Sequence, residues 1–236
     1  MSSLSGVDAV LFDLDGTLVD TTELILTSHQ HVIERHLSGR WQPTRRELIQ
    51  NLGRSLPETL LEYAVADDSA NVAEAAEQML QTYRDYQQAN HDRMIRPVES
   101  MRDTLLVLRA RGYTLGVVTS KLEATARLAL DRYELGGLLP LGVFHDDTTR
   151  HKPDPEPLLL ALSKGGLSAD RTVYVGDSVH DIAAGRAAGV RTVAALWGPF
   201  DRSDLELAGP DAMAVTPLDL LRLLPARAGA VGAAER

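Results

Sequence analysis

From residue 97 onward, the sequence alternates between short apolar segments and longer segments with helical spacing, and this alternation limits the fold more than any other feature. The short segments are typical of strands and the longer ones of amphipathic helices. The predicted strands are 113–118, 141–144, 172–175 and 190–196, and the predicted helices are 98–111, 121–133, 155–165 and 179–188. Such a pattern predicts βαβ units and therefore an α/β fold, with helices on both faces of a parallel sheet.

One more strand is predicted near the N-terminus, where residues 7–12 form an apolar run that ends at Asp13 and Asp15, followed by Gly16. Residues two apart in a strand point to the same side, roughly 7 Å apart along the backbone, so both carboxylates face one site. Two carboxylates this close repel each other, and a hard cation such as Mg²⁺ would satisfy both. One carboxylate could then attack while the other exchanges a proton, so the pattern favours phosphoryl transfer.

The aspartate pair also has two simpler interpretations. A calcium loop of the EF-hand type needs a preceding helix and a glycine at its sixth position, but here a strand-like run precedes and Gly16 is fourth. A strand end with two solvated aspartates remains open for an isolated pair. The other strand ends therefore decide between a structural and a functional role.

Polar side chains follow the other predicted strands as well, and in open α/β sheets ligands bind at the carboxyl ends of the strands. Each such residue has a structural alternative, such as a helix N-cap, a solvated loop lysine or a turn aspartate. Their joint arrival at one sheet edge favours a site instead. The residues are Thr119, Ser120, Lys152, Asp177 and Asp181.

Composition narrows the class of protein further. The chain has 236 residues, no cysteine, a net charge of −9 and no run of Lys and Arg, so we expect no disulfide, no thiolate metal site and no nucleic-acid partner. No apolar stretch approaches the roughly 20 residues of a membrane span, and the N-terminus lacks the features of a signal peptide, so we expect a cytoplasmic protein without a membrane partner. The tail 226–236 is expected to be disordered. The histidines form no helical pair suited to zinc and are interpreted as surface or incidental residues, namely His29, His31, His145, His151 and His180.

Residues 18–93 differ from the rest of the chain, because they are polar and helix-rich with few strand-like runs. Capping-box patterns at Thr44 and Ser55, each with glutamate three residues later, predict two helix starts. A connector at 51–54 separates them, and helical spacing predicts one long helix over 66–90. The sequence therefore predicts a small helical bundle at 18–93, inserted into a core formed by 1–17 and 94–236.

Four segments together resemble the motifs of the haloacid dehalogenase superfamily of phosphatases, and the resemblance covers nearly the whole chain. The segments are D-L-D-G-T-L-V-D-T at 13–21, V-V-T-S at 117–120, K-P-D-P-E-P at 152–157 and G-D-S-V-H-D at 176–181. The resemblance implies a Rossmann-like core with a helical cap that closes over the substrate. It also implies Mg²⁺ as cofactor and a small phosphorylated compound as substrate.

The resemblance assigns a role to each motif residue. Asp13 would form an aspartyl-phosphate, and Asp15 would protonate the leaving group and then activate water. Thr119, with the Ser120 N–H beside it, and Lys152 would bind the phosphoryl group. The metal set would comprise Asp13, Asp15, Asp177 and Asp181, with Asp177 a direct ligand and Asp181 either a second ligand or a support.

Within this family, the segments Y-R-D-Y-Q-Q-A-N-H-D at 83–92 and H-K-P-D-P-E-P-L at 151–158 look most like bacterial phosphoglycolate phosphatases and PpaX-type pyrophosphatases. Arg54 lies where related enzymes have their specificity loop, so we expect it to read the substrate, the alternative being a solvated surface arginine. The predicted activity is hydrolysis of pyrophosphate or 2-phosphoglycolate.

Three other activities of the same fold differ in what they require. Dehalogenases use one carboxylate without metal, so Asp15 and the pair Asp177 and Asp181 argue against them. A β-phosphoglucomutase-like phosphotransferase would isomerise a sugar phosphate, and a regulatory protein would show no turnover. The oligomeric state is left open between a monomer and a small homo-oligomer.

Overall fold

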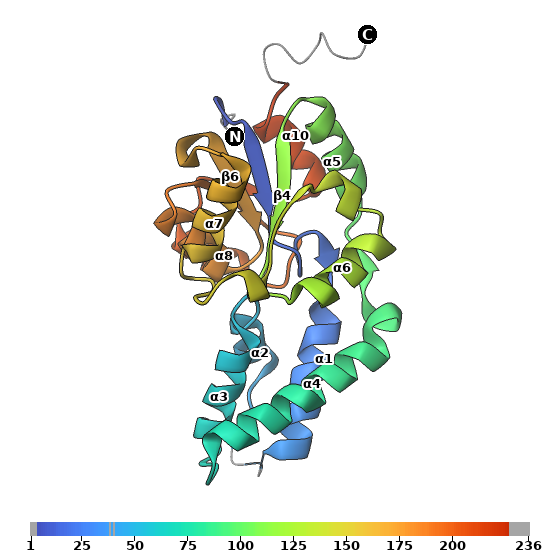
Figure 1. Cartoon of the computed structure of the whole chain (residues 1–236), viewed down its shortest axis with the longest axis vertical. Helices are drawn as coiled ribbons and strands as arrows, with labels where there is room; N and C mark the ends of the chain where they lie inside the picture. The colour runs from blue at the N-terminus through green and yellow to red at the C-terminus, as the bar shows by residue number, and fades with distance from the viewer. Residues whose placement is uncertain (1–3, 38, 40, 227–236) are drawn as a thin grey trace.

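The computed structural model describes residues 4–37, 39 and 41–226, so nearly all of the predicted disordered tail lies outside the described residues. Its centre is one sheet of parallel strands in the order β5-β4-β1-β6-β7-β8 (Figure 1). These strands are β1 (Ala9–Phe12), β4 (Thr114–Val118), β5 (Leu141–Val143), β6 (Thr172–Gly176), β7 (Arg191–Ala195) and β8 (Ala212–Ala214). The prediction of an α/β fold with a parallel sheet is confirmed.

The strand order marks β1 as the switch point of the sheet, where the direction in which successive strands are added reverses. The chain runs outward from β1 to β4 and β5 on one side, and to β6, β7 and β8 on the other. In a doubly wound sheet, the loops at such a switch point part and leave a crevice outside the carboxyl ends of the strands. The ends of β1, β4 and β6 are therefore where a ligand site belongs.

Helices cover both faces of the sheet. On one face, Phe12 and Val117 pack in a cluster with α5, α6 and α10, and on the other face Leu11 and Tyr174 pack with α7 and α8. The alternation of neighbouring strand residues between two apolar layers explains why the strands are apolar throughout. The helices are α5 (Met101–Ala110), α6 (Glu123–Arg132), α7 (Glu156–Gly165), α8 (Val179–Ala187), α9 (Arg202–Ala208) and α10 (Leu220–Leu223), with short 3₁₀ turns η1 (Gly136–Leu138), η2 (His145–Asp147), η3 (Ala169–Arg171) and η4 (Pro217–Asp219).

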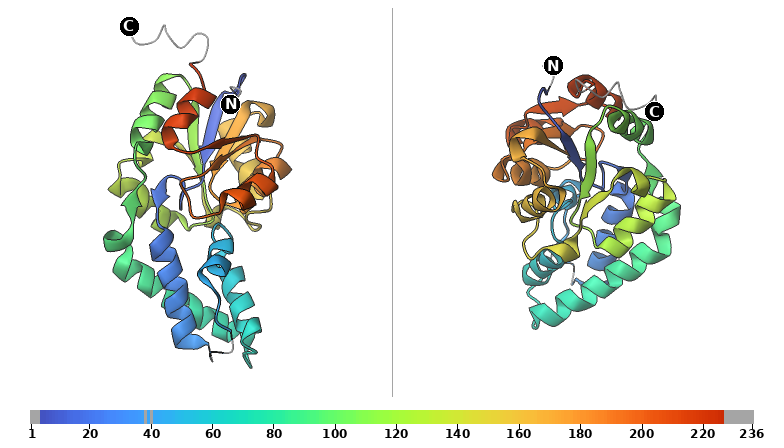
Figure 2. Two further views of the ribbon diagram at one scale, coloured as in Figure 1. Left: turned by 180° about the vertical axis from the view of Figure 1, so that it is seen from behind. Right: turned by 45° about the horizontal axis from the view of Figure 1, so that its top comes forward.

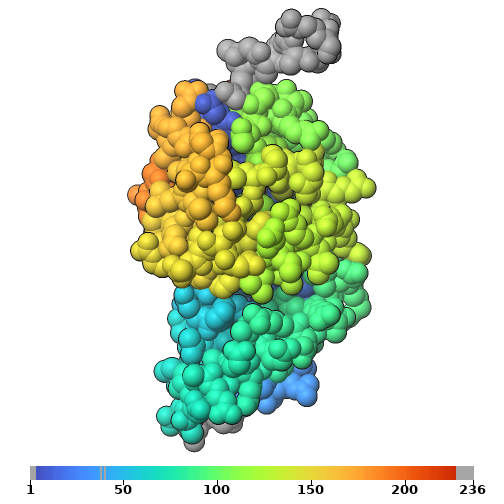
Figure 3. Space-filling view, viewed as in Figure 1, coloured from blue at the N-terminus to red at the C-terminus, as the bar shows by residue number. Residues whose placement is uncertain are grey.

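Residues 21–95, which follow the first motif and precede α5, build a separate helical lobe at the carboxyl end of the sheet (Figures 1 and 2). It contains α1 (Thr22–His36), α2 (Arg45–Gln50), α3 (Leu56–Ala66) and α4 (Val72–Met94), with α4 packed along both α1 and α3. The chain enters and leaves the lobe through a short antiparallel pair, β2 (Val19–Asp20) and β3 (Arg96–Pro97). The predicted boundaries at residues 18 and 93 lie next to this crossing. Figure 3 shows the lobe and the core meeting directly on one face of the molecule.

The local helix predictions are mostly confirmed, with two errors in the lobe. Thr44 forms the predicted capping box, but Ser55 starts α3 without a side-chain capping bond, so the capping box there was wrong. The single long helix predicted over 66–90 is present as α4, but its predicted start was wrong, because residue 66 ends α3 and α4 starts only at residue 72. Asp68 interrupts the pattern with a positive φ of 57°, and the Asn71 side chain caps the start of α4.

None of the helices within the described residues combines the length and the apolar character that a membrane crossing requires.

Candidate active site

Three neighbouring strand ends bring most of the predicted site residues together. Asp13 follows β1, Thr119 follows β4 and Asp177 follows β6. The backbone N–H groups of Asp13 and Thr119 donate to Val175 and Val143 at 2.9 and 3.0 Å, so the sheet ladder fixes the backbone at both residues. Backbone hydrogen bonds of the sheet alone thus fix the positions of the first two motifs.

A buried cluster of carboxylates lies at this edge of the sheet. Asp13, Asp177 and Asp181 each offer an oxygen within 4.8 Å of the others, and all three are buried. The Lys152 ammonium donates to Asp13 Oδ1 and to Asp181 Oδ1 at 2.7 Å each, and to Tyr174 Oη at 3.2 Å. One buried cationic side chain therefore contacts two of three buried carboxylates.

This imbalance of charge appears in the pKa values. Burial raises the pKa of Asp13 to about 7, and the charge of Asp181 adds to this, although Lys152 opposes it. Burial, together with Asp181 and Asp13, also raises the pKa of Asp177 well above its ordinary value. A cation between Asp13 and Asp177 would relieve both groups, and carboxylate oxygens are the ligands of hard divalent cations. The donor set therefore fits a hard divalent cation.

Asp181 differs from its two neighbours, because both of its oxygens already have protein donors. Lys152 and Tyr174 donate to Oδ1, the latter at 3.0 Å, and the Ser178 N–H and Oγ donate to Oδ2 at 3.0 and 2.6 Å. Burial alone would raise its pKa, but Lys152 and Ser178 outweigh burial, and the pKa is lowered. Of the two predicted roles for Asp181, the hydrogen bonds favour support of Lys152.

Asp177 sits in a pocket of backbone that only glycine leaves open. Its Oδ1 accepts a hydrogen bond from Thr17 Oγ1 at 2.7 Å. A Cβ atom at Gly16 would lie 2.3 Å from Asp177 Oδ2, and one at Gly198 would lie 2.3 Å from Asp177 Cβ. Gly16 also has a φ of +81°, a conformation that L-residues rarely adopt. The glycine of the first motif is thus required by the carboxylate of the fourth.

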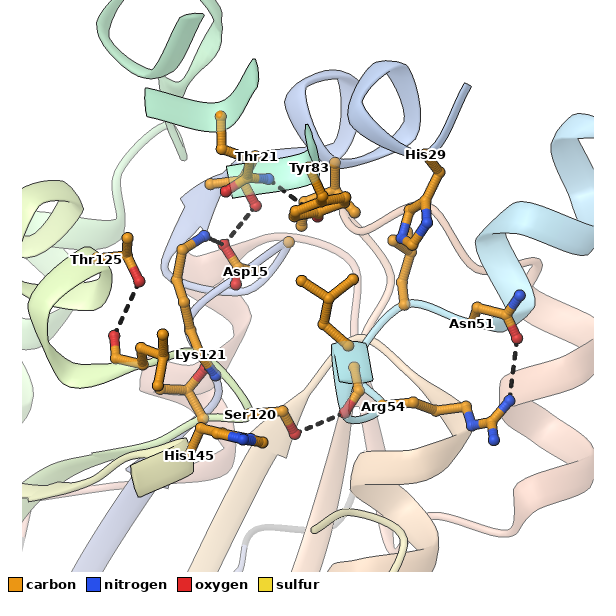
Figure 4. Close-up of a pocket in the computed structure, with 18 of the residues that line it drawn as sticks. Asp15, Thr21, His29, Asn51, Arg54, Tyr83, Ser120, Lys121, Thr125 and His145 are labelled. Atoms are coloured by element: carbon orange, nitrogen blue, oxygen red, sulfur yellow. Dashed lines mark hydrogen bonds and ion pairs between the residues drawn. The ribbon is translucent and has the colours of Figure 1, made fainter. Parts of the chain in front are cut away.

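Asp15 lies outside the carboxylate cluster and has its own partners. Lys121 Nζ and Thr21 Oγ1 both donate to Asp15 Oδ1, at 2.7 and 2.6 Å (Figure 4). With Oδ1 held from two sides, Oδ2 is the oxygen left for a substrate. The place of Asp15 in the metal set stays a prediction. The role of Lys121 was missed from the sequence, although its position directly after Thr119 and Ser120 was a usable signal.

The second motif contacts the helical lobe. Thr119 is buried, lines the cavity described below and accepts the Lys121 N–H at 3.2 Å. Ser120 Oγ donates to the carbonyl oxygen of Gly53 in the lobe connector at 2.8 Å. The phosphate-binding roles predicted for both residues stay predictions. The Ser120 bond ties this part of the core to the lobe.

A cavity of about 480 Å³ separates the lobe from the strand ends, and Asp13, Asp15 and Asp177 line its core side. Its size falls in the range of sites for small molecules. The exposed residues of the lining belong only to α4 and α6, so the cavity opens between these two helices. They are Arg84, Gln88, Asp92 and Leu128.

Arg54, the predicted specificity residue, lines the cavity but already has partners. Its guanidinium donates to Asn51 Oδ1 at 3.2 Å (Figure 4). It also forms a two-pronged ion pair with Glu62, one contact being 2.9 Å. A substrate anion would have to compete with the Glu62 carboxylate. Its role in substrate recognition stays a prediction.

The interpretation of His29 as a surface or incidental residue was wrong. His29 is buried in the lobe, forms a 3.2 Å hydrogen bond with Tyr63 Oη and packs edge-on against the Tyr83 ring. Burial lowers its pKa to about 4. Its spacing of three residues from Leu26 and from Val32 could have revealed this buried helix face.

His180 lies at the seam between the core and the lobe rather than free on the surface. Its Nε2 donates to the carbonyl oxygen of Gln50, at the end of α2, at 2.8 Å. Together with the Ser120 bond to Gly53, it gives two contacts from core side chains to main-chain carbonyls of the lobe.

Comparisons with known proteins agree with this geometry. A model of the haloacid dehalogenase-like hydrolases matches residues 10–195. The pyrophosphatase PpaX of Bacillus pumilus (strain SAFR-032) is 37% identical over 222 residues, which cover 94% of this chain and 98% of that relative. The crystal structure of a hydrolase from Pseudomonas syringae matches with a TM-score of 0.79 at 25% identity, covering 91% of this chain and 96% of that one. A predicted phosphoglycolate phosphatase from Haemophilus somnus 129PT shares the fold, with a TM-score of 0.80 at 22% identity over 93% and 98% of the two chains.

Proposed function

The chain belongs to the haloacid dehalogenase-like hydrolases, and from this premise we propose that it is a Mg²⁺-dependent phosphatase that works through an aspartyl-phosphate on Asp13. Inorganic pyrophosphate is the leading substrate, because the relative from Bacillus pumilus is a pyrophosphatase and is similar over nearly its whole length. 2-Phosphoglycolate is the second. The observation that carries the proposal is the buried contact of Asp13 with Lys152, beside Asp177, at the closed end of the cavity.

The first step is attack by an Asp13 oxygen on phosphorus. The bond from phosphorus to the leaving oxygen breaks, and Asp15 gives that oxygen its proton. Lys152 neutralises charge on Asp13 and so allows an anionic nucleophile to approach an anionic phosphate. In this proposal Thr119, at the end of β4, donates its hydroxyl to the transferring group.

The second step releases phosphate. Asp15, now ionised, accepts a proton from water, whose oxygen attacks the phosphorus of the aspartyl-phosphate and restores the Asp13 carboxylate. Because Lys121 and Thr21 hold Oδ1 of Asp15, its Oδ2 can serve both proton transfers without a change of rotamer. A bound Mg²⁺, held by Asp13 and Asp177, would supply the remaining positive charge.

The proposal is tested by phosphate release from a panel of phosphate compounds, with Mg²⁺ and after treatment with EDTA. We expect activity with Mg²⁺, none after chelation and poor replacement by Ca²⁺, which prefers longer bonds and more ligands. Binding is checked separately by thermal unfolding, where Mg²⁺ should raise the Tm of the parent but not of Asp177→Asn. Full activity after exhaustive chelation would exclude the metal. Isomerisation of a sugar phosphate would instead indicate a phosphotransferase, and failure to turn over any compound a regulatory protein.

A further inference from the structure

One wall of the cavity carries polar groups that the protein itself leaves without partners. Arg54, Arg84 and Lys121 are the arginine and lysine residues among the described cavity lining. Arg54 pairs with Glu62 and Lys121 pairs with Asp15, whereas Arg84 makes no ion pair or hydrogen bond to any described residue. Its guanidinium is therefore the uncompensated cationic group of the lining.

Two histidines of the same wall also have unpartnered nitrogens. Within the described residues, His145 Nδ1 and His91 Nε2 are buried without a hydrogen bond, and both residues line the cavity. Such a nitrogen costs about 1 to 3 kcal/mol unless a ligand or water satisfies it. The other ring nitrogen of His91 contacts Asp92 at 2.9 Å, so with its proton there Nε2 can accept from a ligand hydroxyl or water.

These groups line one cavity, which allows them to act on one ligand. Arg84 and His91 are seven residues apart on α4, which places them on one helix face about 10 Å apart along the axis. Burial lowers the pKa of His145, and the stacked His151 lowers it further; Asp146 opposes this shift, and Arg84 adds to it. The neutral His145 ring can donate through Nδ1.

The wall also lies on the correct side of the reaction centre. The backbone N–H of His145 donates to the carbonyl oxygen of Lys121 at 3.0 Å, and the ammonium of Lys121 donates to Asp15. Asp15 is the acid proposed for the leaving oxygen. The rest of the leaving group should therefore extend from Asp15 toward the wall formed by α4 and η2.

We propose that Arg84, assisted by His145, is the specificity-determining residue that binds an anionic group on the leaving side of the scissile bond. This inference rests on the proposed function. The shared chemistry is a cluster of anionic oxygens, supplied by the second phosphate of pyrophosphate or by the carboxylate of 2-phosphoglycolate. Arginine can hold either with two parallel hydrogen bonds.

The experiment compares kcat/KM for pyrophosphate, 2-phosphoglycolate and p-nitrophenyl phosphate in the parent, Arg84→Ala, Arg84→Lys, Arg54→Ala and Arg93→Ala. Arg93 is the matched control, because it is an exposed arginine of α4 that does not line the cavity. We expect Arg84→Ala to lower kcat/KM about 10- to 100-fold for whichever of pyrophosphate and 2-phosphoglycolate Arg84 binds through its distal anion. For p-nitrophenyl phosphate, the loss in kcat/KM should be less than about 2-fold. Arg84→Lys should recover part of the loss, and Arg93→Ala should match the parent.

Comparison of pyrophosphate with 2-phosphoglycolate shows whether Arg84 binds a phosphate or a carboxylate, since the larger loss in kcat/KM identifies the group that it binds. A uniform loss on all three substrates, no loss, or a selective loss in Arg54→Ala alone would overturn the assignment. Binding of the non-hydrolysable methylenediphosphonate, measured by calorimetry with Mg²⁺, decides the question even if the parent hydrolyses nothing. There Arg84→Ala should weaken binding at least about 10-fold while inorganic phosphate binding changes little, and equal binding by parent and variant would contradict the proposal.

Discussion

The two ends of the cavity differ in how their polar groups are satisfied. At the strand ends, Lys152 makes three hydrogen bonds and both oxygens of Asp181 are occupied. At the wall between α4 and η2, Arg84 has no partner among the described residues and His145 Nδ1 is buried without one. The hydrogen bonds of the strand-end part are thus complete, whereas those of the wall are not; in the proposed function the first part acts on the phosphoryl group and the second faces the rest of the substrate.

The difference has an energetic meaning. Removal of one member of a buried ion network typically costs about 3 to 5 kcal/mol of stability, because a charge is left unpaired, so the strand-end centre is held in one geometry. At the wall, the polar groups lack partners in the protein, so a ligand that supplies the missing hydrogen bonds would stabilise them. The predictions below test this division, from the largest expected effect to the smallest.

The largest effect is expected from the strand-end centre. Asp13→Asn should lose at least about 10⁴-fold in kcat, because it removes the proposed nucleophile while preserving the shape of the side chain. Phosphate release from pyrophosphate and from p-nitrophenyl phosphate is the measurement, with cooperative thermal unfolding as the check on folding. Asp103→Asn, an exposed aspartate of α5, is the control and should match the parent. A variant at residue 13 with nearly parental turnover would remove the covalent step.

The second prediction tests whether Asp15 protonates the leaving group, as proposed. Asp15→Asn keeps an oxygen acceptor for Lys121 and Thr21 but cannot exchange a proton, so we expect a loss of about 10² to 10⁴-fold. The loss should be smaller for p-nitrophenyl phosphate than for an alkyl phosphate, because p-nitrophenolate leaves without a proton. Equal losses on the two esters would show that Asp15 does not act as the acid.

The smallest effect concerns stability and pH, where the two regions have opposite signs. The folded pKa of His29 is about 4, against an ordinary value of 6.5, so the unfolded chain binds more protons and stability falls as pH falls through this window. The raised pKa of Asp13 acts in the other direction, favouring the folded state as pH falls below about 7.

Urea unfolding of the parent and of His29→Gln at pH 7.5, 6.5, 5.5 and 4.5 isolates the contribution of His29. The free energy of unfolding of the parent should fall relative to the variant by up to about 1.4 kcal/mol for each pH unit below 6.5. Above pH 7 the difference between the two proteins should be constant. Parallel curves over the whole range would mean that His29 is not held neutral in the lobe.

The sequence predicted the sheet well because its strands are apolar throughout and their ends carry distinctive residues. The predicted strand 172–175 and the observed β6 differ by one residue, for example. The short elements after residue 196 were missed, since β8 has three residues and α10 has four, too few for a periodic pattern. The break before α4 was missed because the apolar spacing continues across it, and only Asp68 and Asn71 mark the turn.

At the site, residue types were easier to predict than the partners they choose. Lys152 and Asp177 could be located from motif spacing, but the pairing of Asp181 with Lys152 depends on the packing of α8 against β6. The ion pair between Arg54 and Glu62 joins residues eight apart across a helix start, which no local pattern indicates. Such contacts follow from the tertiary arrangement and were accessible only from the structure.

The contacts of Ser120 with Gly53 and of His180 with Gln50 have a consequence for how this lobe can diverge. On the lobe side, both acceptors are main-chain carbonyl oxygens, which every amino acid carries. Substitution of Gln50 would leave its contact in place, whereas Gly53 is constrained, because a Cβ there would lie 2.9 Å from Ser178 Oγ. The side chains that face the substrate can therefore be exchanged during evolution while these two attachments of the lobe to the core persist, so a new substrate preference can arise without a new way of closing the site.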